Sequence, residues 1–227
     1  MGNSKLKIIA AAIAVLYIGV QTFQWFVFTK IPITGNNVTD FINGSNSWNI
    51  YRSSFMLISM FGLLFIYFVI CLDGFLYNKA LSILAFLGFF IFIFFEIMIR
   101  PVELFYIQIY LPSEYLSTAD KPGKSSIISI YEGFQQVEFA LYFPLGLAQL
   151  LGSILLFYVF PSSPRVHYLI KITLLLNALR LALRMLTTYL KINILPDPVY
   201  DAIYLPMVFV FFSLTAAWLF KTAKVKT

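Results

Sequence analysis

Six long apolar runs constrain the fold of this chain more than any other feature of its sequence. They lie near Leu6–Phe28, Ile50–Leu72, Ala80–Arg100, Phe134–Phe160, Val166–Leu190 and Val199–Phe220. The hydrocarbon core of a bilayer takes about 20 helical residues to cross, and each run is long enough. We therefore expect an all-α polytopic membrane protein with six transmembrane helices in one bundle, forming a single domain over residues 1–227.

The composition supports this class and excludes others. Only 11% of the residues are charged, whereas a soluble domain is typically about 25% charged. The net charge of +6 comes from basic residues beside the apolar runs, where they orient a membrane protein, so we expect no nucleic-acid partner. The single cysteine, Cys71, excludes an intramolecular disulfide and a thiolate metal cluster.

The charges between the runs predict the orientation. If the N-terminus is cytoplasmic, the inner segments carry Lys5, Lys7, Lys79, Arg165, Lys171, Lys221, Lys224 and Lys226, against one acid, Asp73. The outer segments carry Lys30, Arg52, Lys121, Lys124 and Lys191, together with Asp40, Glu114, Asp120, Glu132, Asp197 and Asp201. This distribution follows the positive-inside rule and predicts that both termini are cytoplasmic.

The longer connections are expected on the outer side. They are Gly35–Asn49, which is rich in Asn, Gly and Ser, and Leu111–Ser126, which contains the turn signal Lys121-Pro122-Gly123. Matches to the glycosylation acceptor pattern at Asn37 and Asn43 matter only in a secretory pathway, and short Asn-rich loops produce them by chance. The expected location is a bacterial inner (plasma) membrane.

Ionisable residues form a stripe at the end of the third run. Glu96, Arg100 and Glu103 follow one another at i, i+4 and i+7, which places them within an arc of about 60° on an α-helix. Ionisable groups in or near lipid are costly and need partners. We therefore searched the other runs for groups that could compensate them.

The fourth and fifth runs supply candidate partners. Glu138 and Tyr142 share a face of the fourth run, and Asn177, Arg180 and Arg184 share a face of the fifth. Inserting two central arginines into a membrane costs about 6 kcal/mol of free energy, and inserting the Leu and Ile residues of the fifth run recovers about 5 kcal/mol. The fifth run therefore either spans with its polar face compensated in the bundle or lies amphipathically at the interface.

The embedded charges balance. Three acids (Glu96, Glu103 and Glu138) face three bases (Arg100, Arg180 and Arg184). Arginine makes bidentate bonds to carboxylates. We therefore expect Arg180 and Arg184 of the fifth run to pair with these glutamates. Gly146 and Gly152 in the fourth run are expected to allow close approach of a neighbouring helix.

These groups lie toward the outer ends of their runs, which predicts an outward-facing polar pocket or a buried ionic clasp. The candidate residues are Glu96, Arg100, Glu103, Glu138, Tyr142, Asn177, Arg180 and Arg184. The leading hypothesis is a non-enzymatic protein that binds membrane lipid, or an amphiphilic or anionic small ligand, or that serves as an accessory subunit to a membrane protein partner. The sequence leaves open whether the stripe binds a ligand or only contacts neighbouring helices.

Two alternatives remain. A proton-coupled secondary transporter would use Glu96, Glu103 or Glu138, but it predicts more polar positions in the inner half of the bundle. A lipid-modifying enzyme would use the same carboxylates for acid–base chemistry, although the nearby arginines oppose a raised carboxyl pKa. The sequence shows no nucleophile, phosphate-loop or zinc motif, and its one histidine, His167, is remote from the acids. We expect no catalytic residue, metal or cofactor.

Overall fold

The computed structural model describes residues 2–31, 34–192, 194 and 197–224, and these residues contain helices and no strand. The elements are α1 (Gly2–Lys30), α2 (Asn37–Gly44), α3 (Ser47–Gly74), α4 (Lys79–Pro101), the π-helix η1 (Val102–Tyr110), α5 (Leu111–Ser117), α6 (Lys121–Val159), α7 (His167–Thr188) and α8 (Asp197–Lys224). The all-α prediction is confirmed.

Five helical segments in the described chain are long and apolar enough to cross a membrane. They are Ser4–Lys30, Ser47–Gly74, Lys79–Ser117, Lys121–Val159 and Ala202–Lys224. The chain therefore fits an integral, multi-pass membrane protein. Helix α7 is not among these five segments, and it contains Lys171, Asn177, Arg180 and Arg184.

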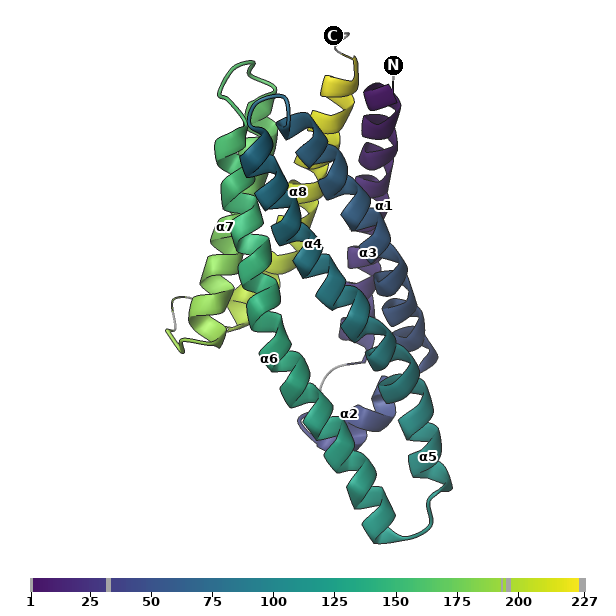
Figure 1. Ribbon diagram of the computed structural model, residues 1–227. Coiled ribbons are helices and arrows are strands. Elements are labelled where there is room, and N and C mark those ends of the chain that lie inside the picture. Colours follow the sequence, from purple (N-terminus) through teal and green to yellow (C-terminus); the bar gives the residue numbers. More distant parts are fainter. Residues whose placement is uncertain (1, 32–33, 193, 195–196, 225–227) are drawn as a thin grey trace.

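The long helices form a closed ring. Each of α1, α3, α4, α6, α7 and α8 packs against the next, and α8 packs back against α1. The Ser4 hydroxyl donates to the backbone carbonyl of Ala223 at 2.7 Å, so the start of α1 and the end of α8 lie together at one end of the bundle, the terminal end (Figure 1). We call the opposite end the far end.

A helical projection extends beyond the far end of the ring. The continuous segment α4–η1–α5 and helix α6 contain 39 residues each, roughly 58 Å at 1.5 Å per residue and about twice the thickness of a bilayer core. Both run past the other helices, and α2 packs against α6 there (Figure 1). The projection has its own small core of Phe41, Ile107, Leu111 and Ile127.

This projection corrects two predicted connections. Leu111–Ser126 is helical except at residues 118–120, because Asp120 caps α6 by accepting the N–H of Gly123 at 2.8 Å, with Pro122 in the first turn. Asp120 and Pro122 therefore mark a helix start here, not a turn. Gly35–Asn49 likewise contains α2, which Asn36 caps by accepting the N–H groups of Val38 and Thr39.

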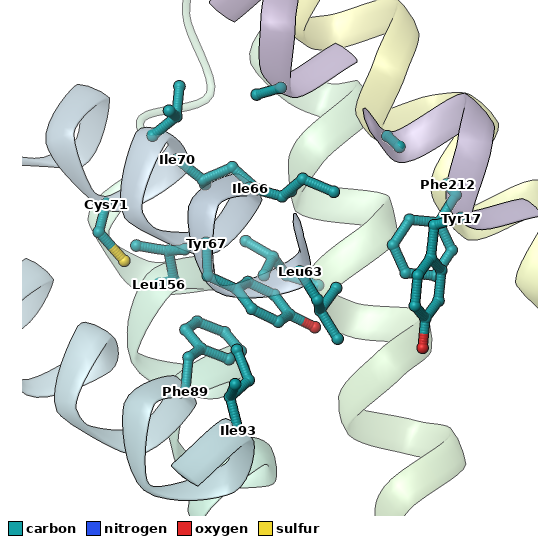
Figure 2. Packing of buried hydrophobic residues seen from close by; sticks show 14 of the residues in the cluster. Tyr17, Leu63, Ile66, Tyr67, Ile70, Cys71, Phe89, Ile93, Leu156 and Phe212 are labelled. Atoms are coloured by element: carbon teal, nitrogen blue, oxygen red, sulfur yellow. The ribbon is translucent and has the colours of Figure 1, made fainter. Parts of the chain in front are cut away.

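The main core is apolar and aromatic. The rings of Tyr67 in α3 and Phe89 in α4 stack in parallel at 3.9 Å, with Leu156 of α6 beside them, and Tyr17 of α1 contacts Phe212 of α8 at 4.5 Å (Figure 2). At the terminal end, Lys7 pairs with the buried Asp73 at 2.6 Å. This ion pair joins α1 to α3.

Glycines bring α4 and α6 into backbone contact. A Cβ atom at Gly88 would lie 2.6 Å from the carbonyl oxygen of Ala148, and one at Gly152 would lie 3.0 Å from that of Ala85. The close approach expected at Gly152 is confirmed. At Gly146 a Cβ would meet nothing nearer than the sulfur of Met185 at 4.0 Å, so that glycine is not required for packing.

Candidate functional site

The site is built where α4 changes into a π-helix. Pro101 has no N–H, which interrupts the hydrogen-bond ladder of α4, and the nine-residue π-helix η1 begins at the next residue. Its last turn shows the i→i+5 pattern, because the N–H of Leu111 donates to the carbonyl of Tyr106. Such segments are rare and frequent at functional sites.

An ionic cluster surrounds this transition. Arg100 donates through Nε to Glu96 Oε2 at 2.8 Å and through Nη1 to Glu103 Oε2 at 2.9 Å. Arg52 of α3 donates through Nη2 to the other oxygen, Glu103 Oε1, at 2.9 Å. Two arginines thus balance two glutamates. All four side chains are at most 14% exposed.

Arg52 pairs with Glu103, but it is not among the candidate residues predicted from the sequence, which indicated only that Arg52 lies near the outer side. Its Nε donates to Asn49 Oδ1 at 2.6 Å, and its guanidinium carbon lies 5.0 Å from the ring of Phe28. Arg52 therefore joins α1, the start of α3 and the π-helix. Its position one helix before α4 in the ring explains the contact.

Gln108 is the second residue that sequence reasoning missed. Its Nε2 donates to Glu103 Oε1 at 3.0 Å. On an α-helix, residues five apart point about 140° away from each other, whereas i→i+5 geometry brings them onto one face. The partnership follows from the π-helix, for which the sequence offers no signal except the preceding proline.

Glu138 and Tyr142 of α6 join the cluster through a hydroxyl group. Tyr142 donates to Glu138 Oε1 at 3.1 Å and accepts from Arg100 Nη2 at 3.5 Å. Within the described part of the chain, Glu138 forms no ion pair. The predicted grouping of α4 with the fourth run is therefore present, but it is mediated by Tyr142.

The predicted pairing of the α7 arginines with these glutamates is wrong. Arg180 donates to Asn177 Oδ1 at 3.1 Å, Asn177 donates to Ser153 Oγ at 2.8 Å, and Arg184 is exposed. In the ring, α6 stands between α4 and α7, and the arginines that pair with Glu96 and Glu103 come from α4 and α3. Ser153, Asn177 and Arg180 form a separate polar group.

A cavity of about 230 Å³ lies beside the ionic cluster. It is lined by the end of α1 and by α2, α3, η1 and α6. The charged residues in its wall are Asp40, Arg52, Glu103 and Glu138, and the aromatic residues are Phe28, Phe41, Tyr131 and Phe134. One side of the wall is thus polar and another is aromatic.

The polar wall contains a satisfied carboxylate and a partly satisfied amide. Asp40 accepts from the hydroxyl and the N–H of Thr34, both at 2.7 Å, and these bonds hold the pKa of the Asp40 carboxyl below its usual value. Gln108, by contrast, is 5% exposed and its Oε1 has no hydrogen-bond partner among the described residues.

In the ranges that the structure covers, no three His, Cys, Asp or Glu side chains are grouped so as to hold a metal ion. The carboxylates of Glu96 and Glu103 are occupied by guanidinium groups. The comparisons with known proteins found no match, whether to a family model, a curated protein or a solved structure.

Proposed function

We propose that this chain is a six-span membrane protein, with both termini cytoplasmic, that binds the headgroup of an amphiphilic ligand in the cavity at its far end. The observation that carries the proposal is the wall of that cavity, which joins a buried ionic cluster to four aromatic rings. Pockets that bind small molecules combine an apolar lining with a few placed polar groups. The location proposed for the chain is a bacterial inner membrane.

The size of the cavity limits what it holds. A volume of about 230 Å³ is below the roughly 300–1,000 Å³ of pockets that enclose a drug-sized ligand. A headgroup fits, whereas a long hydrocarbon chain must lie outside. The cavity sits where the ring of helices ends, so the chain of such a ligand would extend into the adjoining leaflet.

The ligand can be tested by native mass spectrometry of the protein purified from membranes. Asn43→Trp places a large ring in the lining, and Ile42→Trp is the matched control because Ile42 is an exposed neighbour outside the lining. We expect an amphiphile of defined mass on the wild type and on Ile42→Trp, and its loss from Asn43→Trp. Equal retention by Asn43→Trp would contradict binding in this cavity.

The topology rests on the charges of the two bundle ends. The terminal end carries Lys5, Lys7, Lys79, Arg165, Lys171, Lys221 and Lys224 against Asp73, which supports a cytoplasmic terminal end. We propose that α7 is the sixth span, because its 22 residues cover roughly 33 Å and it packs between α6 and α8.

Thiol labelling tests this topology. Cysteines are placed singly at the exposed Ser162, before α7, and at the exposed Ile192, after it. A membrane-impermeant reagent applied to intact cells should label Ile192→Cys and not Ser162→Cys. The native Cys71 is 1% exposed and serves as the unlabelled background. Labelling of both sites from one side would refute a spanning α7.

A second function, that of an accessory subunit, is supported by the projection. Phe105, Tyr106, Ile109 and Tyr110 of η1 are each at least 40% exposed, and contiguous exposed apolar patches mark protein–protein or membrane interaction sites. A photocrosslinker at Tyr110 in native membranes should give one discrete higher-mass product with a membrane protein. The control is Tyr158, which is 71% exposed near the terminal end of α6. Identical products from both positions would remove this support.

A further inference from the structure

Exposed lysines gather where α1 and α8 meet at the terminal end of the bundle. Lys5 of α1 and Lys221 and Lys224 of α8 are all exposed. The two chain termini mark this end in Figure 1, which is opposite to the end that holds the cavity. We call these three residues the basic surface.

The packing of α1 against α8 puts these lysines on one side of the helix pair. The Ser4 hydroxyl donates to the carbonyl of Ala223 at 2.7 Å, so these two residues face each other on helices that run in opposite directions. Along two antiparallel right-handed helices, the next residue turns by about 100° toward the same side of the pair. Lys5 and Lys224 therefore lie on the same side, and Lys221 lies one turn before Lys224 on the same face of α8.

This side faces away from the ring of helices. Lys7 is two residues after Lys5 and points about 160° away from it, and there it pairs with the buried Asp73 of α3 at 2.6 Å. Helix α3 is the other neighbour of α1 in the ring. The basic surface is therefore on the lipid-facing side of α1 and α8.

The positive charge of this surface is not balanced within the described part of the chain. None of the ion pairs found there involves Lys5, Lys221 or Lys224. Asp73 is the one described acid at the terminal end, and its charge is matched by Lys7. Like charges held together repel each other, so a second copy of the same surface is disfavoured and an anionic partner is favoured.

Apolar side chains continue the surface deeper into the bundle. Ile8 is three residues after Lys5, and Phe220 is four residues before Lys224, so each shares a face with its lysine. They are 47% and 41% exposed. Because α1 begins and α8 ends at this end, both lie about 5 Å deeper than the lysines. Cations at the membrane surface with apolar groups beneath them match the order of headgroup and acyl chain in a phospholipid.

We propose that the basic surface binds an anionic phospholipid, with its phosphate on Lys5 and Lys224 and its acyl chains against Ile8 and Phe220. Lysine ammonium groups form charge-assisted hydrogen bonds to phosphate oxygens, and basic residues between transmembrane helices bind anionic lipid headgroups. A zwitterionic phospholipid also carries a cation, which these lysines repel. The site is at the opposite end from the cavity and is independent of the ligand proposed there.

Native mass spectrometry of the purified full-length chain in an uncharged detergent tests this proposal. The protein is titrated separately with dioleoylphosphatidylglycerol, dioleoylphosphatidylcholine and glycerophosphoglycerol, which is the first lipid without its acyl chains. We expect phosphatidylglycerol to bind at least about tenfold more tightly than either other probe, because each lysine near the surface favours an anionic lipid about fivefold. Equal affinity for the two lipids would overturn the proposal. Equal affinity for glycerophosphoglycerol would also overturn it, because the ligand would then be a soluble phosphate ester.

Two matched double variants locate the site. Lys5→Gln with Lys224→Gln should weaken phosphatidylglycerol binding about twentyfold, which is two factors of about five. Lys79→Gln with Arg165→Gln removes two exposed charges from the same end but outside α1 and α8, and it should change the affinity less than about twofold because distant surface charges are screened. Equal losses in both double variants would reduce the effect to diffuse charge and overturn the site.

A conservative variant separates the ionic contact from any effect on folding. Lys5→Arg with Lys224→Arg keeps both charges and their hydrogen-bond donors, so it should bind phosphatidylglycerol within about twofold of the wild type. Its loss of binding, with an unchanged unfolding midpoint in the absence of lipid, would contradict the phosphate contact.

Discussion

Glu103→Gln is the substitution for which the structure gives the sharpest expectation. The carboxylate of Glu103 accepts from Arg52 at 2.9 Å, from Arg100 at 2.9 Å and from Gln108 at 3.0 Å. Glutamine has nearly the same shape but one acceptor oxygen and no charge. Arg100 would then keep the carboxylate of Glu96, Arg52 would lose its carboxylate partner, and these four residues would carry one net positive charge.

The expected loss of stability follows from that imbalance. Removing one partner of a buried ion pair costs about 3–5 kcal/mol, because the remaining charge is left uncompensated. Arg100 keeps Glu96, so the main cost falls on Arg52 and a value near the lower limit, about 3 kcal/mol, is expected. For a chain of this size that corresponds to a fall of the unfolding midpoint on the order of 10 °C.

Thermal unfolding in detergent, followed by tryptophan fluorescence, measures this change. Glu114→Gln is the control, because Glu114 is exposed and forms no ion pair with a described residue. The double variant Arg52→Gln with Glu103→Gln restores charge balance and should recover at least about half of the loss. A midpoint for Glu103→Gln within about 2 °C of the control, or strict additivity in the double variant, would refute the reasoning.

Three further predictions concern other parts of the fold. Gly88→Ala should destabilise the protein by about 1–3 kcal/mol in the same assay, because its methyl group would meet the α6 backbone, whereas Gly133→Ala, with nothing within 4 Å, should be neutral or stabilising. The pKa of Asp40 is lowered on folding. Its contribution to the stability of the fold is therefore fully present above the unfolded pKa of about 3.9 and is lost as the pH falls through the folded pKa. An NMR titration of this carboxyl should give a midpoint below about 3.9. Trp218 donates to Nδ1 of His167 at 3.2 Å, so nitrogen NMR of the single histidine should show a proton on Nε2, and Trp218→Phe should cost about 1–3 kcal/mol.

The helices themselves were predictable, except where they leave the expected apolar runs. The run predicted at Ile50–Leu72 is α3 (Ser47–Gly74), and the run predicted at Val166–Leu190 is α7 (His167–Thr188). Hydropathy reports the stretch that lipid can cover, so it gave no indication that the helix beginning at Lys121 continues into the run expected at Phe134–Phe160. The proline and glycine after Lys121 were interpreted as a turn, although a proline near a helix start is equally ordinary.

The candidate site was predictable only as far as local helical spacing reaches. Glu96 and Arg100 are four residues apart and bond as an α-helix requires. The contact between Arg52 and Glu103 depends on which helices are neighbours, and charge counting alone cannot supply that order. The same limit produced the wrong pairing of Arg180, because equal numbers of acids and bases are compatible with many arrangements of the ring.

The π-helix connects the ionic cluster to the cavity. If residues 102–110 were α-helical, Gln108 would point about 140° away from Glu103, and its bond to that carboxylate would not exist. Pro101 removes the N–H that would continue α4 as an α-helix, and the change of helix type follows at once. The rare backbone geometry therefore completes the coordination of Glu103 within the bundle, because it places Gln108 on the same face as that carboxylate.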